Sequence, residues 1–140
     1  MFSKSNLIST LVTAIWGYLA GWLLWGMLMD PILEEHNAAT GIMKEMPDMV
    51  HLLIGCIISG FVFSSIYSKW ANGNFGPSSG LSYGIWVGVL FGLGAGMIDM
   101  SVMNMLDFTG TMLNGATYIV FYAIMGLLAG LIYQKISPAD

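Results

Sequence analysis

Four long uncharged segments constrain this sequence more than any other feature. They cover residues 5–29, 49–68, 70–98 and 108–134, with a neutral His51 near the start of the second. Each segment can supply the roughly 20 apolar residues that cross about 30 Å of hydrocarbon as a helix. Because these segments use most of the 140 residues, we predict an all-α transmembrane four-helix bundle, a single domain over residues 1–140.

The composition agrees with a protein that lies in a lipid bilayer. Hydrophobic residues make up 56% of the chain and charged residues 9%, whereas a soluble domain has about 25% charged residues. With a net charge of −4 and no basic patch, we expect no nucleic-acid partner. The first segment is too long and too rich in tryptophan for a signal peptide, so we expect it to be retained.

The lysines predict how the bundle is oriented. Lys4, Lys69 and Lys135 lie on one side of the predicted bundle, and Lys44 alone lies on the other. The positive-inside rule therefore places both termini in the cytoplasm. On the same side, we expect Tyr67, Trp70 and Tyr133 to anchor the helices at the membrane interface.

Matching residues suggest that the chain contains two copies of a helical hairpin. Ile15-Trp16 recurs as Ile85-Trp86, and Gly26-Met27 recurs as Gly96-Met97. Thr40-Gly41-Ile42-Met43 recurs as Thr109-Gly110-Thr111-Met112, and Ile66-Tyr67-Ser68-Lys69 recurs as Ile132-Tyr133-Gln134-Lys135. Gly60 is likewise matched by Gly126. The alternative is chance identity among common membrane residues. Duplication predicts repeats over about residues 5–69 and 75–135, related by a pseudo-twofold axis along the membrane normal. It makes Asp30 and Asp99 near-equivalent.

Glycines recur every fourth residue along the third predicted helix, 80–106. They are Gly80, Gly84, Gly88, Gly92 and Gly96, and the same spacing relates Gly126 to Gly130 and Gly17 to Gly21. Residues four apart share a helix face, and small residues let helices approach closely in lipid. We therefore expect these glycines to pack the helices together, as a glycine zipper, around an almost apolar interior.

The side opposite the three lysines collects acidic residues and histidines. They are Asp30, Glu34, Glu35, His36, Glu45, Asp48, His51, Asp99 and Asp107. The simplest interpretation is a solvated rim, in which Asp48 caps the second helix. The alternative is a metal site in which Asp48 and His51, three residues apart, are joined by Glu34, Glu35 or His36. Such mixed ligands suit zinc, manganese or iron, although no tight motif such as HExxH is present.

Methionines on that side give a second metal hypothesis. Met43, Met46 and Met49 have helical i, i+3 spacing, and so do Met97, Met100 and Met103. Thioether ligands favour Cu(I). The competing interpretation is that these flexible side chains fill gaps between helices.

Asp99 leaves two interpretations open. At about 1.5 Å per residue it lies roughly 28 Å along the helix from Gly80, which is close to the membrane interface. If Asp99 instead faces the bundle, it must be paired or protonated and becomes a functional candidate.

Three segments carry a resemblance to a known family. They are the loop Thr-Gly-Ile-Met-Lys-Glu at 40–45, the turn Tyr-Ser-Lys-Trp at 67–70 and the run Met-Asn-Met-Leu-Asp-Phe-Thr-Gly at 103–110. From about Trp22 to Lys135 the chain resembles a family of small four-span bacterial membrane proteins with no established activity. The resemblance implies the same topology and a place in the bacterial inner membrane, and it transfers no functional residue.

The sequence favours a function that is not enzymatic. It has no nucleophile elbow, phosphate loop or dinucleotide fingerprint, so we expect no catalytic residues and no cofactor. The leading hypothesis is a bundle that works through helix contacts, as a homo-oligomer or as an accessory subunit of another membrane protein. The alternative is a small protein that handles or passes a cation or Cu(I), using the acidic, methionine-rich side as its mouth.

Overall fold

The computed structural model describes residues 2–37, 46 and 48–137 of the chain. Its helical segments are α1 (Lys4–Leu23), the π-helical η1 (Leu24–Met29), α2 (Asp30–Glu34), α3 (Met49–Ala71), α4 (Pro77–Gly88), the π-helical η2 (Val89–Ala95), α5 (Gly96–Val102) and α6 (Phe108–Ile136). They join into four helices, Lys4–Glu34, Met49–Ala71, Pro77–Val102 and Phe108–Ile136, each long and apolar enough to cross a membrane. The predicted all-α bundle of four membrane-spanning helices is therefore confirmed.

Polar side chains define where three of the four helices begin. Ser3 Oγ accepts a hydrogen bond from the Asn6 amide at 3.2 Å and caps α1. Asp48 caps α3, as predicted, by accepting from the amides of Val50 and His51 at 3.1 Å each. Asp107 caps α6 by accepting from the Gly110 amide at 2.7 Å. Each carboxylate or hydroxyl satisfies amides that have no partner inside the helix.

The third helix covers residues 77–102 and not 80–106. It starts at Pro77, whose missing amide hydrogen costs nothing in the first turn. It ends at Val102, because Met103 has extended backbone angles of φ −132° and ψ 143°. Residues 103–107 therefore form the turn into α6. The turn from α3 to α4 covers residues 72–76 and uses left-handed backbone conformations at Asn72 and Gly73.

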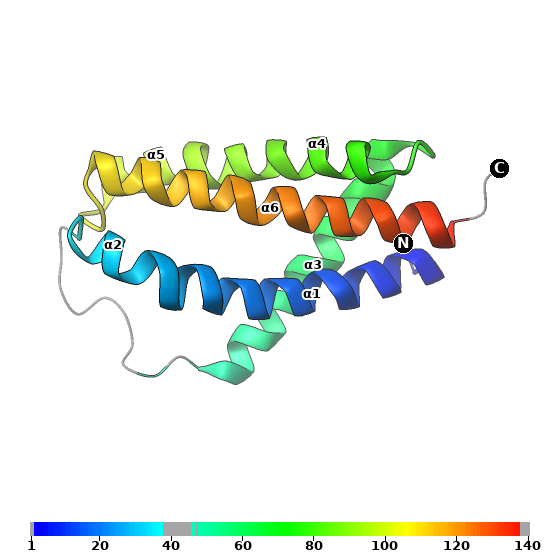
Figure 1. Ribbon diagram of the computed structural model, residues 1–140, viewed down its shortest axis with the longest axis horizontal. Helices are drawn as coiled ribbons and strands as arrows, with labels where there is room; N and C mark the ends of the chain where they lie inside the picture. Colours follow the sequence, from blue (N-terminus) through cyan, green and yellow to red (C-terminus); the bar gives the residue numbers. More distant parts are fainter. Residues whose placement is uncertain (1, 38–45, 47, 138–140) are drawn as a thin grey trace.

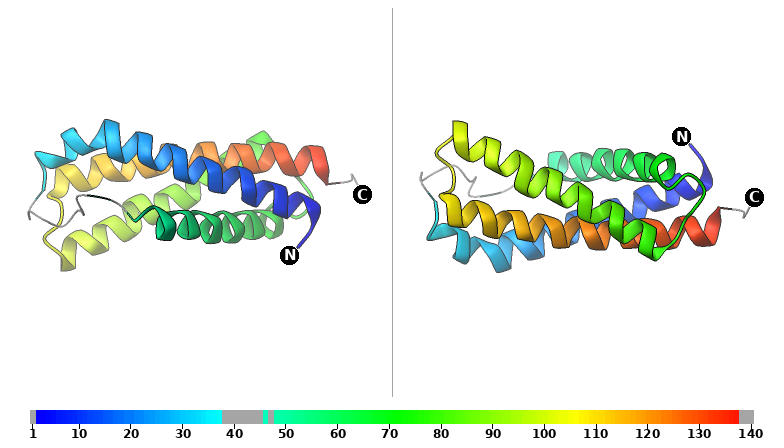
Figure 2. Two further views of the ribbon diagram at one scale, coloured as in Figure 1. Left: turned by 90° about the horizontal axis from the view of Figure 1, so that it is seen from below. Right: turned by 90° about the horizontal axis from the view of Figure 1, so that it is seen from above.

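The helices form two hairpins that meet through α1 and α6. The second hairpin places α4, η2 and α5 alongside α6, and the first places α1 against α3 (Figure 1). α1 also packs on α6, whereas α3 runs obliquely across the bundle and contacts α4 and α6 much less (Figure 2). The hydroxyls of Ser5 and Ser137 are 2.9 Å apart, so the start of α1 lies beside the end of α6.

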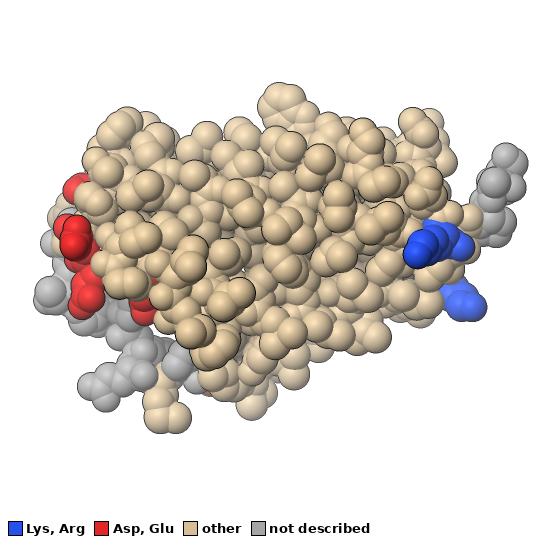
Figure 3. Space-filling view, viewed as in Figure 1, with Lys and Arg blue, Asp and Glu red and all other residues tan. Residues whose placement is uncertain are grey.

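In the part of the chain that the structure describes, charged residues lie at the two ends of the bundle, and the face seen in Figure 3 is uncharged between them. The described lysines, Lys4, Lys69 and Lys135, lie at what we call the lysine end, and the described acidic residues lie at the acidic end. The surface between the ends exposes large side chains, such as Trp86 at 67% and Ile98 at 64%. Such a surface fits lipid better than water, as expected of an integral membrane protein.

An aromatic core lies towards the lysine end. It comprises Ala20, Phe63, Tyr67, Ala71, Tyr83, Phe121, Met125, Ala129 and Tyr133. The expectation that Tyr67 and Tyr133 anchor the protein at the interface is wrong, because these side chains are 0% and 1% exposed. Their hydroxyls find partners inside the protein, which makes burial of the rings favourable. Trp70 alone of the three is exposed.

Candidate functional site

The glycines of α4 and η2 lie directly on the backbone of α6. A Cβ atom placed on Gly88 would be 2.5 Å from Ile119 Cα, and one on Gly92 would be 2.6 Å from the Gly115 carbonyl oxygen. Cβ atoms on Gly80 and Gly84 would likewise collide with the carbonyls of Gly126 and Tyr122. Because backbone atoms cannot rotate away, any side chain here must separate the helices. Gly96 differs, since its Cβ would make an ordinary contact of 3.5 Å with Thr111 Cγ2.

α6 presents its own glycines to the same contact. Cβ atoms on Gly126 and Gly130 would collide with the carbonyls of Gly80 and Gly76, respectively. Gly115, which the sequence analysis missed, would meet Leu93 Cδ2 at 2.6 Å. Its spacing is the signal that could have revealed it, because eleven residues before Gly126 is about three helical turns. In the α4–α6 contact, glycines therefore face glycines near Gly80 and Gly92, and they face the backbone of larger residues near Gly88.

The glycines of α1 are in a different environment. A Cβ on Gly17 would lie 3.6 Å from Cys56 Sγ, an ordinary contact, and one on Gly21 would meet nothing within 4 Å. The close approach of α1 to α3 occurs instead at Gly60, whose Cβ would be 3.0 Å from the Thr10 carbonyl oxygen and 3.1 Å from the Ala14 amide nitrogen. Among the glycines of α1 and α3, Gly60 alone lies this close to the backbone of the other helix.

A row of hydroxyls joins α1 to α3 beside that crossing. Ser9 Oγ lies 2.8 Å from Ser64 Oγ, and the Asn6 amide donates to Ser65 Oγ at 2.9 Å. Ser9, Ser64 and Thr13 are completely buried. The expected almost apolar interior is therefore wrong at the lysine end. The signal was present in the sequence, because Ser5, Ser9 and Thr13 are spaced four apart on one face of α1.

Two successive carbonyls of α3 tie the other helices to it. The Tyr83 hydroxyl of α4 donates to the Phe63 carbonyl at 3.1 Å, and the Tyr133 hydroxyl of α6 donates to the Ser64 carbonyl at 3.0 Å. Buried hydroxyls need such acceptors, since neither lipid nor apolar side chains can replace water. All four helices are thus connected through hydrogen bonds near Phe63 and Ser64.

At the acidic end, the two histidines pair with different aspartates. His36 Nδ1 lies 3.0 Å from Asp107 Oδ2, and His51 Nδ1 lies 2.7 Å from Asp48 Oδ2. Hydrogen bonds from backbone amides, chiefly those of Gly110 and His51, lower the pKa of Asp107 and of Asp48, and each histidine side chain lowers it further. The carboxylates therefore stay charged at neutral pH, and each both caps a helix and binds an imidazole.

The structure does not gather the predicted metal ligands. His36 is directed to Asp107 and not to the Asp48–His51 pair, and Asp30, Glu34 and Glu35 are exposed. Within residues 2–37, 46 and 48–137, no three His, Cys, Asp or Glu side chains lie close enough to hold a metal ion. Glu45 falls outside the described residues. The caps and histidine pairs account for the local geometry without a metal.

The methionine triples are also interrupted. Met97 and Met100 lie on α5, but Met103 lies past the end of that helix, so helical i, i+3 spacing does not extend to it. Met46 and Met49 are exposed near the start of α3, and Met43 falls outside the described residues. A shared thioether face on either triple is therefore not a property of the described helices.

Asp99 lies on α5 and its side chain is exposed. Two polar side chains that could have bonded to Asp99 have other partners. Ser101 Oγ donates to the Met97 carbonyl at 2.8 Å, and Asn114 Oδ1 accepts from the Trp25 indole at 2.7 Å. The alternative in which Asp99 faces the interior of the bundle is therefore excluded, and its position near the membrane interface stays a prediction.

Comparisons of the chain with protein-family models, with curated proteins and with solved structures found no match. The resemblance to a family of four-span bacterial proteins therefore gains no support from them.

Proposed function

We propose that this chain is a non-enzymatic integral membrane protein that acts through helix contacts, as a homo-oligomer or as an accessory subunit of a membrane complex. One observation supports this proposal more than any other. The tight glycines of α4 and α6 contact each other within the chain, while Gly21, Gly55 and Gly94 lie on the spans without a close neighbour from another helix. Glycines without a close neighbour in the monomer leave room for a helix of another molecule, since small residues favour helix association in lipid.

We also propose that the two hairpins are tandem repeats related by a pseudo-twofold axis along the membrane normal. The closest crossings support this. Gly60 meets residues 10 and 14 of α1, and Gly126 meets residues 80 and 84 of α4. Gly60 and Gly126 are 66 positions apart, and the residues that they meet, 10 against 80 and 14 against 84, are 70 positions apart. These differences match the offsets of the sequence repeat. The four residues Thr40 to Met43 of that repeat fall outside the described residues.

The orientation we propose has both termini in the cytoplasm of a bacterial cell. It rests on the three lysines at one end of the bundle and on the positive-inside rule. Under this arrangement the acidic end faces away from the cytoplasm.

Leucine substitutions test the proposed function. They are made at glycines that contact another helix of the chain and at glycines that do not. Gly55→Leu and Gly21→Leu should leave the fold of the monomer intact, because a side chain meets open space there, and should weaken association in lipid bilayers. Gly88→Leu is the matched control, since it should prevent α4 from docking on α6 whether or not the protein associates. Single-molecule photobleaching in liposomes gives the oligomeric state, and circular dichroism and thermal unfolding report the fold. If Gly21→Leu, Gly55→Leu and Gly94→Leu all match the wild type in association, the proposal fails.

A further inference from the structure

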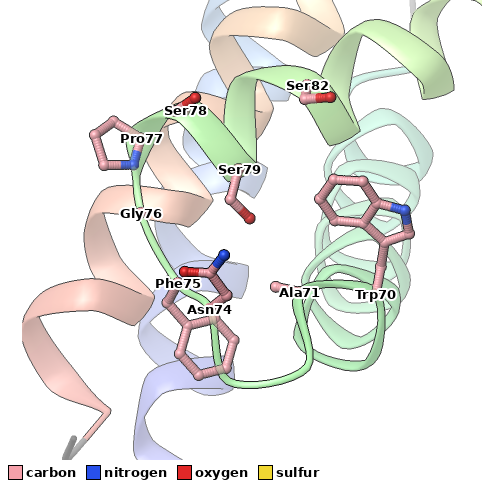
Figure 4. Close-up of a pocket in the computed structure, with 9 residues that line it drawn as sticks. All are labelled: Trp70, Ala71, Asn74, Phe75, Gly76, Pro77, Ser78, Ser79 and Ser82. Carbon is pink, nitrogen blue, oxygen red and sulfur yellow. The ribbon is translucent and has the colours of Figure 1, made fainter.

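A cavity of about 480 Å³ opens at the lysine end, beside the turn that joins α3 to α4 (Figure 4). Its wall combines the indole of Trp70 with the polar side chains of Asn74, Ser79 and Ser82. Figure 4 shows the Asn74 amide and the Ser79 hydroxyl directed towards the same space, with Trp70 on the other side of it. The cavity therefore offers several hydrogen-bond donors beside one large apolar surface.

A buried tyrosine holds the polar wall in place. The Tyr67 hydroxyl lies 3.3 Å from both Ser79 Oγ and the Gly76 carbonyl oxygen, and it accepts from the Gly76 amide at 3.3 Å. Tyr67 is 0% exposed, so this support does not depend on solvent. When Tyr67 donates to Ser79, the proton of the Ser79 hydroxyl remains available to a molecule in the cavity.

The position of the cavity determines which molecules reach it. One candidate span ends at Ala71 and the next begins at Pro77, so the cavity lies where lipid headgroups begin. Tryptophans such as the exposed Trp70 favour that depth.

Charge then selects among the molecules found there. The described lysines lie at this end, and the described acidic residues lie at the other. The end of the bundle around the cavity therefore attracts anions. It contributes no carboxylate, among the residues that the structure describes, that would repel a phosphate.

We propose that this cavity binds the headgroup of an anionic phospholipid. The amide of Asn74 and the hydroxyls of Ser79 and Ser82 donate hydrogen bonds to the phosphate oxygens. The indole of Trp70 packs against the glycerol and the first methylenes of the acyl chains. The lysines at this end supply the positive field that favours an anionic headgroup over a zwitterionic one.

The test uses the full chain in detergent micelles, with phosphatidylglycerol or phosphatidylcholine added. Native mass spectrometry counts bound lipids, and thermal unfolding measures the stabilisation. The variant Asn74→Ala/Ser82→Ala removes one amide and one hydroxyl from exposed positions. Asn104→Ala/Ser101→Ala removes the same groups from exposed positions at the acidic end and is the matched control. A third variant, Ser82→Leu, fills the cavity while keeping Asn74.

The wild type should bind phosphatidylglycerol more tightly than phosphatidylcholine. Both cavity variants should weaken phosphatidylglycerol binding by about tenfold or more, since the loss of one hydrogen bond to a charged group corresponds to at least about tenfold. The acidic-end control should bind as the wild type does. Equal binding of the two lipids would overturn the proposal, and so would unchanged binding by both cavity variants. Stabilisation by inorganic phosphate equal to that by the lipid would show a site for free anions instead. If Lys69→Gln loses binding and the cavity variants do not, surface charge alone would explain the binding, and the proposal would also be overturned.

Discussion

Gly88→Ala tests one of the close backbone contacts between α4 and α6. The new Cβ would lie 2.5 Å from Ile119 Cα and 3.0 Å from the Tyr118 carbonyl oxygen. Carbon atoms in favourable contact are about 3.5–4.0 Å apart. Since both neighbours belong to the backbone, no change of rotamer relieves the overlap. The two helices must therefore move apart by about 1 Å at this point.

The energetic consequence follows from that separation. A gap of about 0.5–1 Å removes a quarter to a half of the dispersion energy between the atoms concerned, and overfilling a packed interior costs about 1–3 kcal/mol. Because both overlapping neighbours are backbone atoms, we expect the overfilling caused by Gly88→Ala to cost about 3 kcal/mol, near the upper limit of that range. The better helix propensity of alanine offsets about 1 kcal/mol. We expect a net loss of about 2 kcal/mol in the free energy of unfolding.

Titration with sodium dodecyl sulfate in mixed micelles, followed by circular dichroism, measures this loss. The control is Gly55→Ala on α3, where a Cβ would meet nothing within 4 Å. It should be neutral or slightly stabilising, since alanine gains propensity without a clash. If Gly88→Ala resists detergent as well as Gly55→Ala does, α4 and α6 are not in close backbone contact at Gly88.

Three further predictions follow from other parts of the structure. Tyr133→Phe removes the hydrogen bond to the Ser64 carbonyl and should cost about 1 kcal/mol of unfolding free energy in the same titration. The pKa of Asp107 is lowered in the folded state. Its contribution to stability is therefore complete above the ordinary pKa of 3.8 and is lost as the pH falls through the lower folded value. Asp107→Asn should flatten this part of the pH dependence of thermal unfolding, and an unchanged profile would contradict the prediction. Protein purified without chelator should carry no copper above background and show no thermal shift with Cu(I). The same should hold after Met97, Met100 and Met103 are replaced by leucine. Copper that binds to the wild type and not to the leucine variant would instead support the metal-handling alternative.

The architecture was predictable because membrane-spanning helices are encoded locally. Length and apolarity predict each span, and the carboxylate of Asp48 next to an apolar run predicts the cap of α3. The boundaries were harder to predict. Met103 continues the apolar pattern of the third helix, yet the chain leaves the helix after Val102.

Contacts between helices were predictable only where backbone geometry dominates. Gly84 and Gly88 can serve few purposes in a helix other than close approach, so their role follows from residue type. Tyr67 and Tyr133 are chemically suited to either the interface or the interior, and only the carbonyls and hydroxyls of neighbouring helices decide between them. His36 likewise pairs with Asp107 because the fold brings together two loops about 70 residues apart, which no local pattern specifies.

The two hairpins achieve close packing by different means, and this difference determines where a partner helix fits. α4 and α6 are held by backbone contacts, which weaken steeply with distance and therefore keep the helices together along their length. α1 and α3 are held near Gly60 by one close crossing and by buried hydroxyls such as Ser9 and Ser64. Towards the acidic end the Tyr18 hydroxyl of α1 still lies 3.4 Å from Met49 Sδ of α3, but a Cβ atom on Gly21 would meet nothing within 4 Å. Backbone contact is close at Gly60 in the first hairpin and at several glycines in the second, and Gly21 has open space beside it. For this reason we expect a partner helix, if the protein associates as proposed, to pack on the first hairpin.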